Sequence, residues 1–240
     1  VNGDLTFWRL NDVETRIYTP VPYSKKPGEM KERGESKINE NDDKTNYLAA
    51  NFYADYEHTV GKHYFKVMAG YNYENSLLKS RYIQRDGLIN NELPDFSLTN
   101  GLNFTLRGGG NEWRTLGGFF RVNYNFDERY LFEVNGRYDG TSKFPQSQQW
   151  GFFPSASAGW RVSREKFWNI PYKAVSDLKL RASYGTLGNG NISPYKFLET
   201  MSVSQLPLVI NGIRPDYTQQ PNVIPNGLTW EKATTLNLGI

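Results

Sequence analysis

The chain has 240 residues, of which 15% are aromatic, and it contains 22 glycines and no cysteine. The lack of cysteine excludes a disulfide framework and thiol chemistry, and a net charge of +3 gives no argument for nucleic acid. The high aromatic share combined with a mean hydropathy of −0.65 is typical of sheets whose rings alternate with hydrophilic side chains. No apolar run reaches about 18 residues, so no transmembrane helix is predicted.

The first 46 residues have the least regular pattern. Residues 1–23 fit one strand pair or one bent strand. Residues 24–46 are rich in Lys, Glu, Asp and Asn without an apolar stripe, and we expect them to form a solvated loop. Asn41, Asp42 and Asp43 resemble the start of a calcium loop, but the Gly and distal Glu of that pattern are missing, which favours a solvated charge cluster.

Further along the chain, seven segments alternate between apolar and polar residues, which predicts β-strands. They are 47–57, 64–74, 115–126, 130–139, 152–162, 178–186 and a less regular 228–240. They are about 10 residues long, enough to cross a bilayer at a tilt. Their polar sides carry charges such as Arg121, Glu133 and Arg137, which suit a wet lumen. A membrane barrel is therefore favoured over a soluble antiparallel sandwich.

The predicted links between strands differ in length. Tight turns are expected at 60–62 and 127–129, intermediate links at 140–151 and 163–176, and long loops at 75–114 and 187–227. Short and long links mostly alternate, as in outer-membrane barrels with short periplasmic turns and long extracellular loops. Within 163–176 we expect Ser163 to cap a short helix that ends at Pro171.

Signals for other chemistry are weak. His58 and His63 flank the first tight turn, but two histidines without a nearby carboxylate or thiol pair make a poor metal site. The glycines at 108–110, 185, 188 and 190 lack the spacing of a phosphate loop and are interpreted as flexible loop positions. We therefore predict no catalytic residues, no metal and no cofactor, and no enzymatic activity.

Four blocks resemble the SusC/RagA-like, TonB-linked transporters of Bacteroidetes-type bacteria. The blocks are 129–144 (RYLFEVNGRYDGTSKF), 150–167 (WGFFPSASAGWRVSREKF), 178–189 (LKLRASYGTLGN) and 228–240 (LTWEKATTLNLGI). Together they cover about the C-terminal half of the chain.

Several residues of these blocks also have a physical interpretation. Gly136 and Gly140 would permit close packing at a strand top. Pro154 lies early in its strand, where a missing donor is tolerated. Phe152, Phe153 and Trp160 fit either an aromatic girdle or ordinary core packing.

The resemblance implies an all-β fold, part of an antiparallel transmembrane β-barrel in the bacterial outer membrane. Plugged transporters have roughly 22 strands, so we expect residues 1–240 to be a barrel fragment without the plug, signal peptide and closing strands. The implied function is TonB-dependent import of a nutrient, an oligosaccharide or a peptide-like molecule, as in polysaccharide utilisation. The implied partners are a SusD-like surface lipoprotein lid, TonB through the missing plug, and outer-membrane lipid.

Arg107, Trp113 and Tyr217 in the two long loops are the predicted substrate contacts. Aromatic rings stack on sugars, and Arg donates hydrogen bonds in a fork. Two other functions stay open: a TonB-dependent siderophore or vitamin receptor, and a soluble β-rich carbohydrate-binding or adhesive module. The soluble module would fold as a monomer without detergent, whereas a barrel fragment would expose an aromatic face and open edges.

Overall fold

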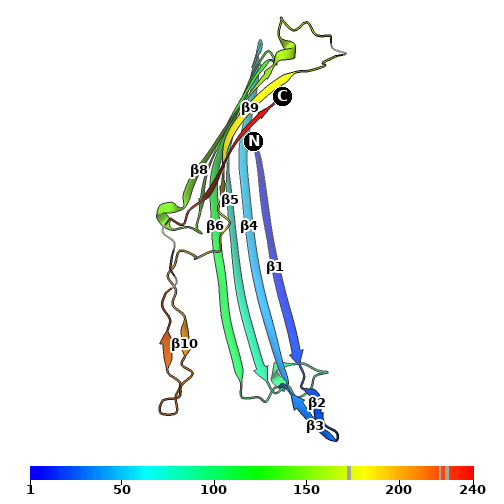
Figure 1. Ribbon diagram of the computed structural model, residues 1–240, viewed down its shortest axis with the longest axis vertical. Helices are drawn as coiled ribbons and strands as arrows, with labels where there is room; N and C mark the ends of the chain where they lie inside the picture. Colours follow the sequence, from blue (N-terminus) through cyan, green and yellow to red (C-terminus); the bar gives the residue numbers. More distant parts are fainter. Residues whose placement is uncertain (172–173, 222, 225–226) are drawn as a thin grey trace. The chain divides into compact units, whose positions relative to one another are not determined.

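A computed structural model describes residues 1–171, 174–221, 223–224 and 227–240. Its main element is an eight-stranded sheet with the strand order β1-β4-β5-β6-β7-β8-β9-β12 (Figure 1). These strands are β1 (Asn2–Tyr18), β4 (Lys37–Val60), β5 (His63–Asp86), β6 (Phe104–Phe126), β7 (Tyr130–Thr141), β8 (Trp150–Arg161), β9 (Lys179–Asn189) and β12 (Glu231–Gly239). In the described part of the chain, no helix is long and apolar enough to cross a membrane.

Smaller elements occupy the links. Two hairpins, β2 (Val21–Lys26) with β3 (Glu29–Arg33) and β10 (Val203–Gln205) with β11 (Asp216–Thr218), form separate two-stranded sheets. Three 3-10 helices are η1 (Phe96–Leu98), η2 (Gln146–Gln148) and η3 (Val162–Arg164). The links at 61–62 and 127–129 are tight turns, and those between β5 and β6 and between β9 and β12 are longer. The predicted alternation of link lengths is thus present, although part of the long loops is strand.

The chain divides into two compact units. Unit 1 comprises Val1–Leu5, Ala49–Glu74 and Trp113–Ile240, and unit 2 comprises Thr6–Leu48 and Asn75–Glu112. Strands β4, β5 and β6 have 24, 24 and 23 residues and contribute to both units. The apolar alternation found in the sequence lies almost entirely in unit 1.

In unit 1 the register aligns like residues across the sheet. One row contains Val122, Val134, Ala156, Tyr184 and Leu236, on five adjacent strands. One residue along, Arg121, Asn135, Ser155, Gly185 and Thr235 form the neighbouring row. Successive side chains point to opposite sides of a strand, so the sheet has one apolar face and one polar face. Val134 is 47% exposed and Leu236 is 67% exposed, as expected of side chains that meet lipid.

Aromatic rings concentrate at the two ends of the apolar face. Near the tight turns, Phe65 and Tyr124 have ring centroids 4.9 Å apart, and Phe126 and Tyr130 are 6.3 Å apart. At the other end Tyr138 stacks on Trp150 at 5.0 Å. Tyr130 and Tyr138 are separated by roughly 26 Å along β7 at about 3.3 Å per residue. At the strand tilt of about 35–45° usual in membrane barrels, this length spans roughly 20 Å of depth, comparable with the apolar band of about 25 Å between the aromatic girdles.

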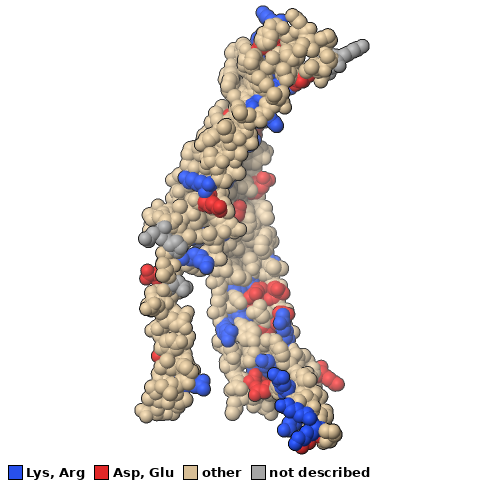
Figure 2. All heavy atoms as spheres, viewed as in Figure 1, with Lys and Arg blue, Asp and Glu red and all other residues tan. Residues whose placement is uncertain are grey.

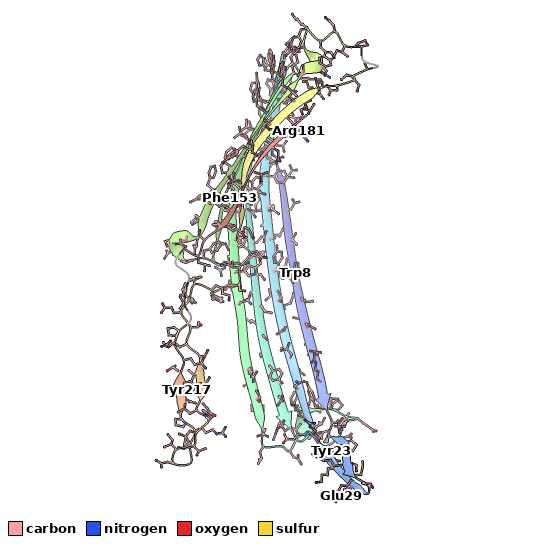
Figure 3. All side chains as sticks on the ribbon, in the orientation of Figure 1. Trp8, Tyr23, Glu29, Phe153, Arg181 and Tyr217 are labelled. Carbon is pink, nitrogen blue, oxygen red and sulfur yellow. The ribbon has the colours of Figure 1, made fainter. Side chains whose placement is uncertain are left out.

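Three rings form a small core on the polar face. Phe144 is fully buried, Phe153 is 7% exposed, and both contact Trp230 with centroid distances of 5.5 and 5.2 Å. Trp230 also donates from Nε1 to the Gln149 carbonyl at 2.8 Å. Of the two alternatives for Phe153, the structure therefore favours core packing, whereas its neighbour Phe152 lies on the apolar face with 49% exposure. Figure 3 labels Phe153 within unit 1.

Most of the singled-out glycines lie against rings or backbone rather than in flexible loops. Residues 108–110 belong to β6, and Gly185 and Gly188 belong to β9, so the prediction of flexible loop positions is wrong for them. A Cβ at Gly188 would collide with the Phe153 ring, and one at Gly190 would lie 2.8 Å from Trp230. A Cβ at Gly136 would lie 2.5 Å from the Phe120 ring and one at Gly140 would lie 2.7 Å from the Trp150 ring, which confirms the close packing at both glycines.

The link after β8 differs from its prediction. Ser163 lies inside η3, whose N-cap position is held by Arg161, and the Ser163 hydroxyl donates to the Asp177 carboxylate. The helix ends at Arg164 and not at Pro171. The Ser163 hydroxyl thus bonds to a nearby side chain and does not cap the helix. Residues 172–173 of this link lie outside the described residues, as do 222, 225 and 226 of the predicted loop 187–227.

Unit 2 overturns two loop predictions. Residues 24–46 contain β3 and the start of β4, and residues 75–114 contain the end of β5 and the start of β6. Asp42 pairs with Lys44 at 2.8 Å within this sheet. Alternation was missing because both faces of these strands carry polar residues, while the ladder needs only backbone groups. Figure 2 shows Lys and Arg gathered over the β2–β3 hairpin, where Tyr23 and Glu29 are labelled in Figure 3.

The start of β4 and the link between β5 and β6, both in unit 2, are well packed. Ile38 and Leu88 are 1% and 6% exposed, and the Gly87 amide donates to the Ser36 carbonyl at 2.6 Å. The Asp95 side chain caps η1 by accepting from the Ser97 hydroxyl at 2.6 Å and from the Ser97 amide at 2.7 Å. These two hydrogen bonds lower the pKa of Asp95. Trp8 stacks on Tyr47 at 5.1 Å on strands β1 and β4 (Figure 3). The link between β5 and β6 is thus an ordered structure.

Candidate functional site

The polar face of unit 1 contains a groove of about 1040 Å³. Its floor consists of small polar residues of β8 and β9, including Ser155, Ser157 and Ser183. Arginines and asparagines of β6 and β7 line one side, and Lys179 and Arg181 of β9 lie on the other. Because side chains alternate along every strand, the same residues that expose apolar atoms outward place these polar atoms in the groove.

One hydrogen-bonded network crosses three strands of the groove. Arg121 Nε of β6 donates to Asn135 Oδ1 of β7 at 2.6 Å. Asn135 Nδ2 donates to Glu133 Oε1 at 2.7 Å and to Ser155 Oγ of β8 at 3.4 Å. Arg121 Nε lies 4.0 Å from Glu133 Oε1, so its charge is compensated within the network.

A second network lies further along the same face. The Arg137 guanidinium forms a two-pronged contact with Asp139, at 3.0 Å from Nε and 2.9 Å from Nη2. Nη2 also donates to Asn72 Oδ1 at 3.3 Å, and the guanidinium lies 5.5 Å from the Phe119 ring centroid. Gly117 leaves the space for this arrangement, since a Cβ there would collide with the Asp139 carboxylate. Paired charges of this kind make a hydrated wall that can contact polar ligands.

Ion pairs also hold together the end of unit 1 that carries the tight turns. Glu165 accepts from Arg129 Nη1 at 3.1 Å and from Trp160 Nε1 at 3.0 Å. Hydrogen bonds from Tyr130 and Trp160, together with the Arg129 charge, hold the pKa of Glu165 below its ordinary value. Lys62 pairs with Asp127 at 2.9 Å, and that hydrogen bond lowers the pKa of Asp127. These pairs tie the turns after β4 and β6 to the link after β8.

The predicted substrate contacts lie on two different elements of the chain, strand β6 and the β10–β11 hairpin. Arg107 lies in β6 within unit 2, with its guanidinium 5.8 Å from the Tyr82 ring centroid. Trp113 is also a β6 residue, but it belongs to unit 1, where Lys143 Nζ lies 4.7 Å from its ring centroid. Burial lowers the pKa of that Lys143. The loop placement is therefore wrong for Arg107 and Trp113, because β6 starts earlier than the apolar pattern suggests.

Tyr217 lies in the β10–β11 hairpin, as labelled in Figure 3, within the predicted long loop. Its role as a substrate contact stays a prediction, as do those of Arg107 and Trp113. The sequence pattern had already placed Arg121, Glu133, Arg137 and Asp139 on the polar side of their strands, but it did not show that they interact. Interaction across strands depends on register, which the alternation alone does not fix.

Metal chemistry finds no support in the described part of the chain, which contains no group of three or more His, Cys, Asp or Glu placed to hold an ion. His63 Nδ1 lies 2.9 Å from the Tyr124 hydroxyl, and its ring packs 4.8 Å from Phe126. His58 stacks on Tyr56 at 6.2 Å. Both histidines have aromatic neighbours typical of a membrane interface.

The apolar face with two aromatic belts, the hydrated polar face and the alternating links define an antiparallel transmembrane β-barrel of the outer-membrane type. The family described as TonB dependent receptor-like, beta-barrel, matches residues 3–240. The chain therefore belongs to the β-barrel family of TonB-dependent receptors, which reside in the bacterial outer membrane.

Two relatives illustrate the match. TonB-dependent receptor SusC of Bacteroides thetaiotaomicron is 32% identical over 215 residues, which cover 83% of this chain and 20% of SusC. TonB-dependent receptor P3 of Formosa agariphila is 29% identical over 198 residues, covering 82% of this chain and 19% of the relative. The chain thus spans about a fifth of the length of these relatives.

Solved structures agree on the fold. The RagAB peptide importer in its closed-closed state matches with a TM-score of 0.79 and 20% identity, over 98% of this chain and 25% of the matched chain. Its open-open state matches with a TM-score of 0.74. At this identity the likeness concerns the fold, and it confirms the expected all-β barrel architecture. The fold resemblance to SusC/RagA-like transporters predicted from the four blocks is also confirmed.

Proposed function

We propose that the protein containing this barrel segment imports a nutrient across the outer membrane in a TonB-dependent manner. The observation that carries the proposal is the polar face of unit 1, where Arg121–Glu133 and Arg137–Asp139 keep charged groups in a groove opposite a lipid-facing surface. Such a face lines a hydrated passage, since charges in a barrel wall are stable only toward water or protein. Nothing in the proposal requires a catalytic step.

For the substrate we propose an oligosaccharide or a peptide-like nutrient. The sequence similarity to SusC and the fold likeness to a peptide importer support this range. Arg107, Trp113 and Tyr217 stay candidates for contacts with such a substrate. A siderophore or vitamin would use the same fold, and uptake measurements separate these classes. The soluble module is not retained, because the chain belongs to an outer-membrane family.

For partners we propose a SusD-like lipoprotein lid and TonB, the latter through a plug outside residues 1–240. The lid proposal is supported by the β10–β11 hairpin, whose end is mostly tan in Figure 2 with one blue group at its side. Leu208, Val209 and Ile213 of the tip are 59%, 55% and 70% exposed. Exposed apolar patches of this kind commonly mark protein contacts.

Uptake by the full-length protein in its native host tests the proposal. Cells in which the gene is deleted should lose uptake of a labelled oligosaccharide or oligopeptide, and the gene on a plasmid should restore it. Replacing residues 203–218 by a short Gly-Ser linker should reduce uptake while the amount of receptor in the outer membrane stays constant. Uptake of labelled ferric chelate alone, with no effect on sugars or peptides, would replace the proposal by the siderophore alternative.

A point-variant series then examines the predicted contacts. Trp113→Ala, Arg107→Ala and Tyr217→Ala are each compared with Tyr195→Ala, an aromatic residue outside the predicted set. Loss of uptake confined to the first three supports them as contacts. Unchanged uptake in all three would remove them from the site.

A further inference from the structure

Two cations on the polar face of unit 1 lack a counter-charge. The other basic residues of the groove are compensated, Arg121 by Glu133 and Arg137 by Asp139. Lys179 and Arg181, two residues apart on β9, form no ion pair or side-chain hydrogen bond with any residue that the structure describes. Both line the groove, and both lie on the same side of β9 as Ser183, the polar side.

Glycines hold these two cations close to the sheet. Arg181 is in register with Gly159 of β8 and with Gly239 of β12, so it has no side chain beside it on either neighbouring strand. A Cβ on Gly239 would lie 2.5 Å from Arg181 Nε, and a Cβ on Gly159 would lie 2.9 Å from Lys179 Cε. The two stems thus lie across the glycines. Arg181 is labelled in Figure 3, where it lies on β9 next to β12.

A third cation adds to the local positive charge. Arg161 of β8 is in register with Lys179, and its Nε is buried without a hydrogen-bond partner. Asp177 and Glu128 lie 3.7 and 3.8 Å from its guanidinium. Arg161, Lys179 and Arg181, together with Arg164, which shares Glu128, are four cations against two carboxylates, so this part of the polar face is positive. Low-dielectric walls strengthen such a field and favour anions.

We propose that Lys179 and Arg181 form an anion-binding site of the barrel interior whose ligand is a carboxylate. An Arg fork and a neighbouring ammonium suit a carboxylate, which accepts charge-assisted hydrogen bonds from both. The carboxylate can come from an acidic molecule passing through the barrel or from an Asp or Glu of another segment of the same protein. The inference rests on the barrel placement and is independent of the proposed import.

Zero-length crosslinking of the purified full-length receptor in detergent tests this site. A carbodiimide joins the Lys179 amine to a carboxylate that contacts it, and peptide mass spectrometry identifies the partner. Lys62, which pairs with Asp127 at 2.9 Å, is the positive control. Lys196, an exposed lysine of the link after β9, gives the background yield. The experiment is run alone, with added tetraglutamate peptide, and with tetraglutamine as the neutral probe.

The crosslinks of Lys179 distinguish an internal ligand, a diffusible ligand and the absence of a site. A crosslink from Lys179 to an acidic residue of the protein without probe identifies an internal ligand. A crosslink to tetraglutamate only identifies a site for a diffusible acidic molecule. In either case Arg181→Gln should lower the Lys179 yield about tenfold, as expected for one charge-assisted hydrogen bond, and Arg181→Lys should restore most of it. A Lys179 yield no higher than that of Lys196 under all three conditions overturns the proposal. Uptake assays play no part in this result.

Discussion

The indole Nε1 of Trp160 donates to the Glu165 carboxylate at 3.0 Å, which joins the ring at the end of β8 to the link that follows it. The same carboxylate accepts from Arg129 in the turn between β6 and β7. One acidic side chain therefore connects two links and the membrane-facing surface, although they are far apart in the sequence.

Glu165→Gln should destabilise the barrel at neutral pH. The pKa of Glu165 is held below its ordinary value of 4.5 by the hydrogen bonds of Tyr130 and Trp160 and by Arg129. A lowered pKa in the folded state stabilises the protein above the ordinary pKa, and this contribution is lost as pH falls through the folded pKa. The stability difference between wild type and Glu165→Gln should thus be full near pH 6–7, begin to shrink as pH falls below about 4.5, and be lost once pH has fallen through the folded pKa.

The shift of the folded band in semi-native gels, taken across temperatures at each pH, measures this difference. Glu199→Gln, an exposed substitution in the link after β9, serves as the charge control. An equal gap between wild type and Glu165→Gln at pH 3 and pH 7 would contradict the role given to the carboxylate.

Gly188→Ala should destabilise unit 1 by about 1–3 kcal/mol, the usual cost of overpacking. The added Cβ would collide with the Phe153 ring, which is 7% exposed and packs on Trp230. Phe153→Leu in the same chain should recover part of the loss, because the smaller side chain frees the space. Urea unfolding from lipid vesicles gives both values. If the double variant is as unstable as the sum of the two single variants, the ring is not the obstacle.

The two faces of unit 1 should respond oppositely to a charge. Val122→Arg places a cation among Val134 and the apolar row, with an expected cost of about 2–4 kcal/mol near the bilayer midplane. Asn123→Arg, one residue along, is in register with Glu133 on the polar face and should change stability little. The two variants are compared by the yield of protein that folds into lipid vesicles and by the urea concentration at the midpoint of unfolding. Comparable damage from both substitutions would reject the face assignment.

Trp230 should contribute to the stability of unit 1 through both its indole nitrogen and its ring. Trp230→Phe removes the Nε1 donor to the Gln149 carbonyl at 2.8 Å and should cost about 1–2 kcal/mol. Trp230→Ala also removes the ring contact with the fully buried Phe144 and should cost about 3–5 kcal/mol. Urea unfolding of both variants separates the contribution of the hydrogen bond from that of the ring. A Phe variant as damaging as the Ala variant would mean that the hydrogen bond dominates.

The sequence predicted unit 1 well, because lipid on one side and water on the other impose alternation on every strand. The predicted 130–139 became Tyr130–Thr141, and 115–126 ends at Phe126 as expected. The same reasoning failed for 24–46 and 75–114, where strands of unit 2 carry polar residues on both faces and show no alternation.

The candidate site was only half visible in the sequence. Arg121, Arg137, Lys179 and Arg181 could be placed on the polar face by their parity. That Arg137 reaches Asn72 of β5 while Arg181 lies between Gly159 and Gly239 follows from register, which a single sequence leaves open. The choice between girdle and core packing was open for Phe153 for a related reason, since an aromatic pair such as Phe152–Phe153 does not reveal which ring is buried.

The glycines beneath aromatic rings have a consequence for how this barrel can change over evolutionary time. Gly136 lies under Phe120, Gly140 under Trp150 and Gly190 under Trp230. A larger residue can replace one of these glycines only after the aromatic residue over it has been replaced by a smaller one. Replacing the aromatic residue alone leaves a cavity until the glycine is also replaced by a larger residue. Each pair is thus inherited as a unit, and among descendants of this chain the two positions should be substituted together or not at all.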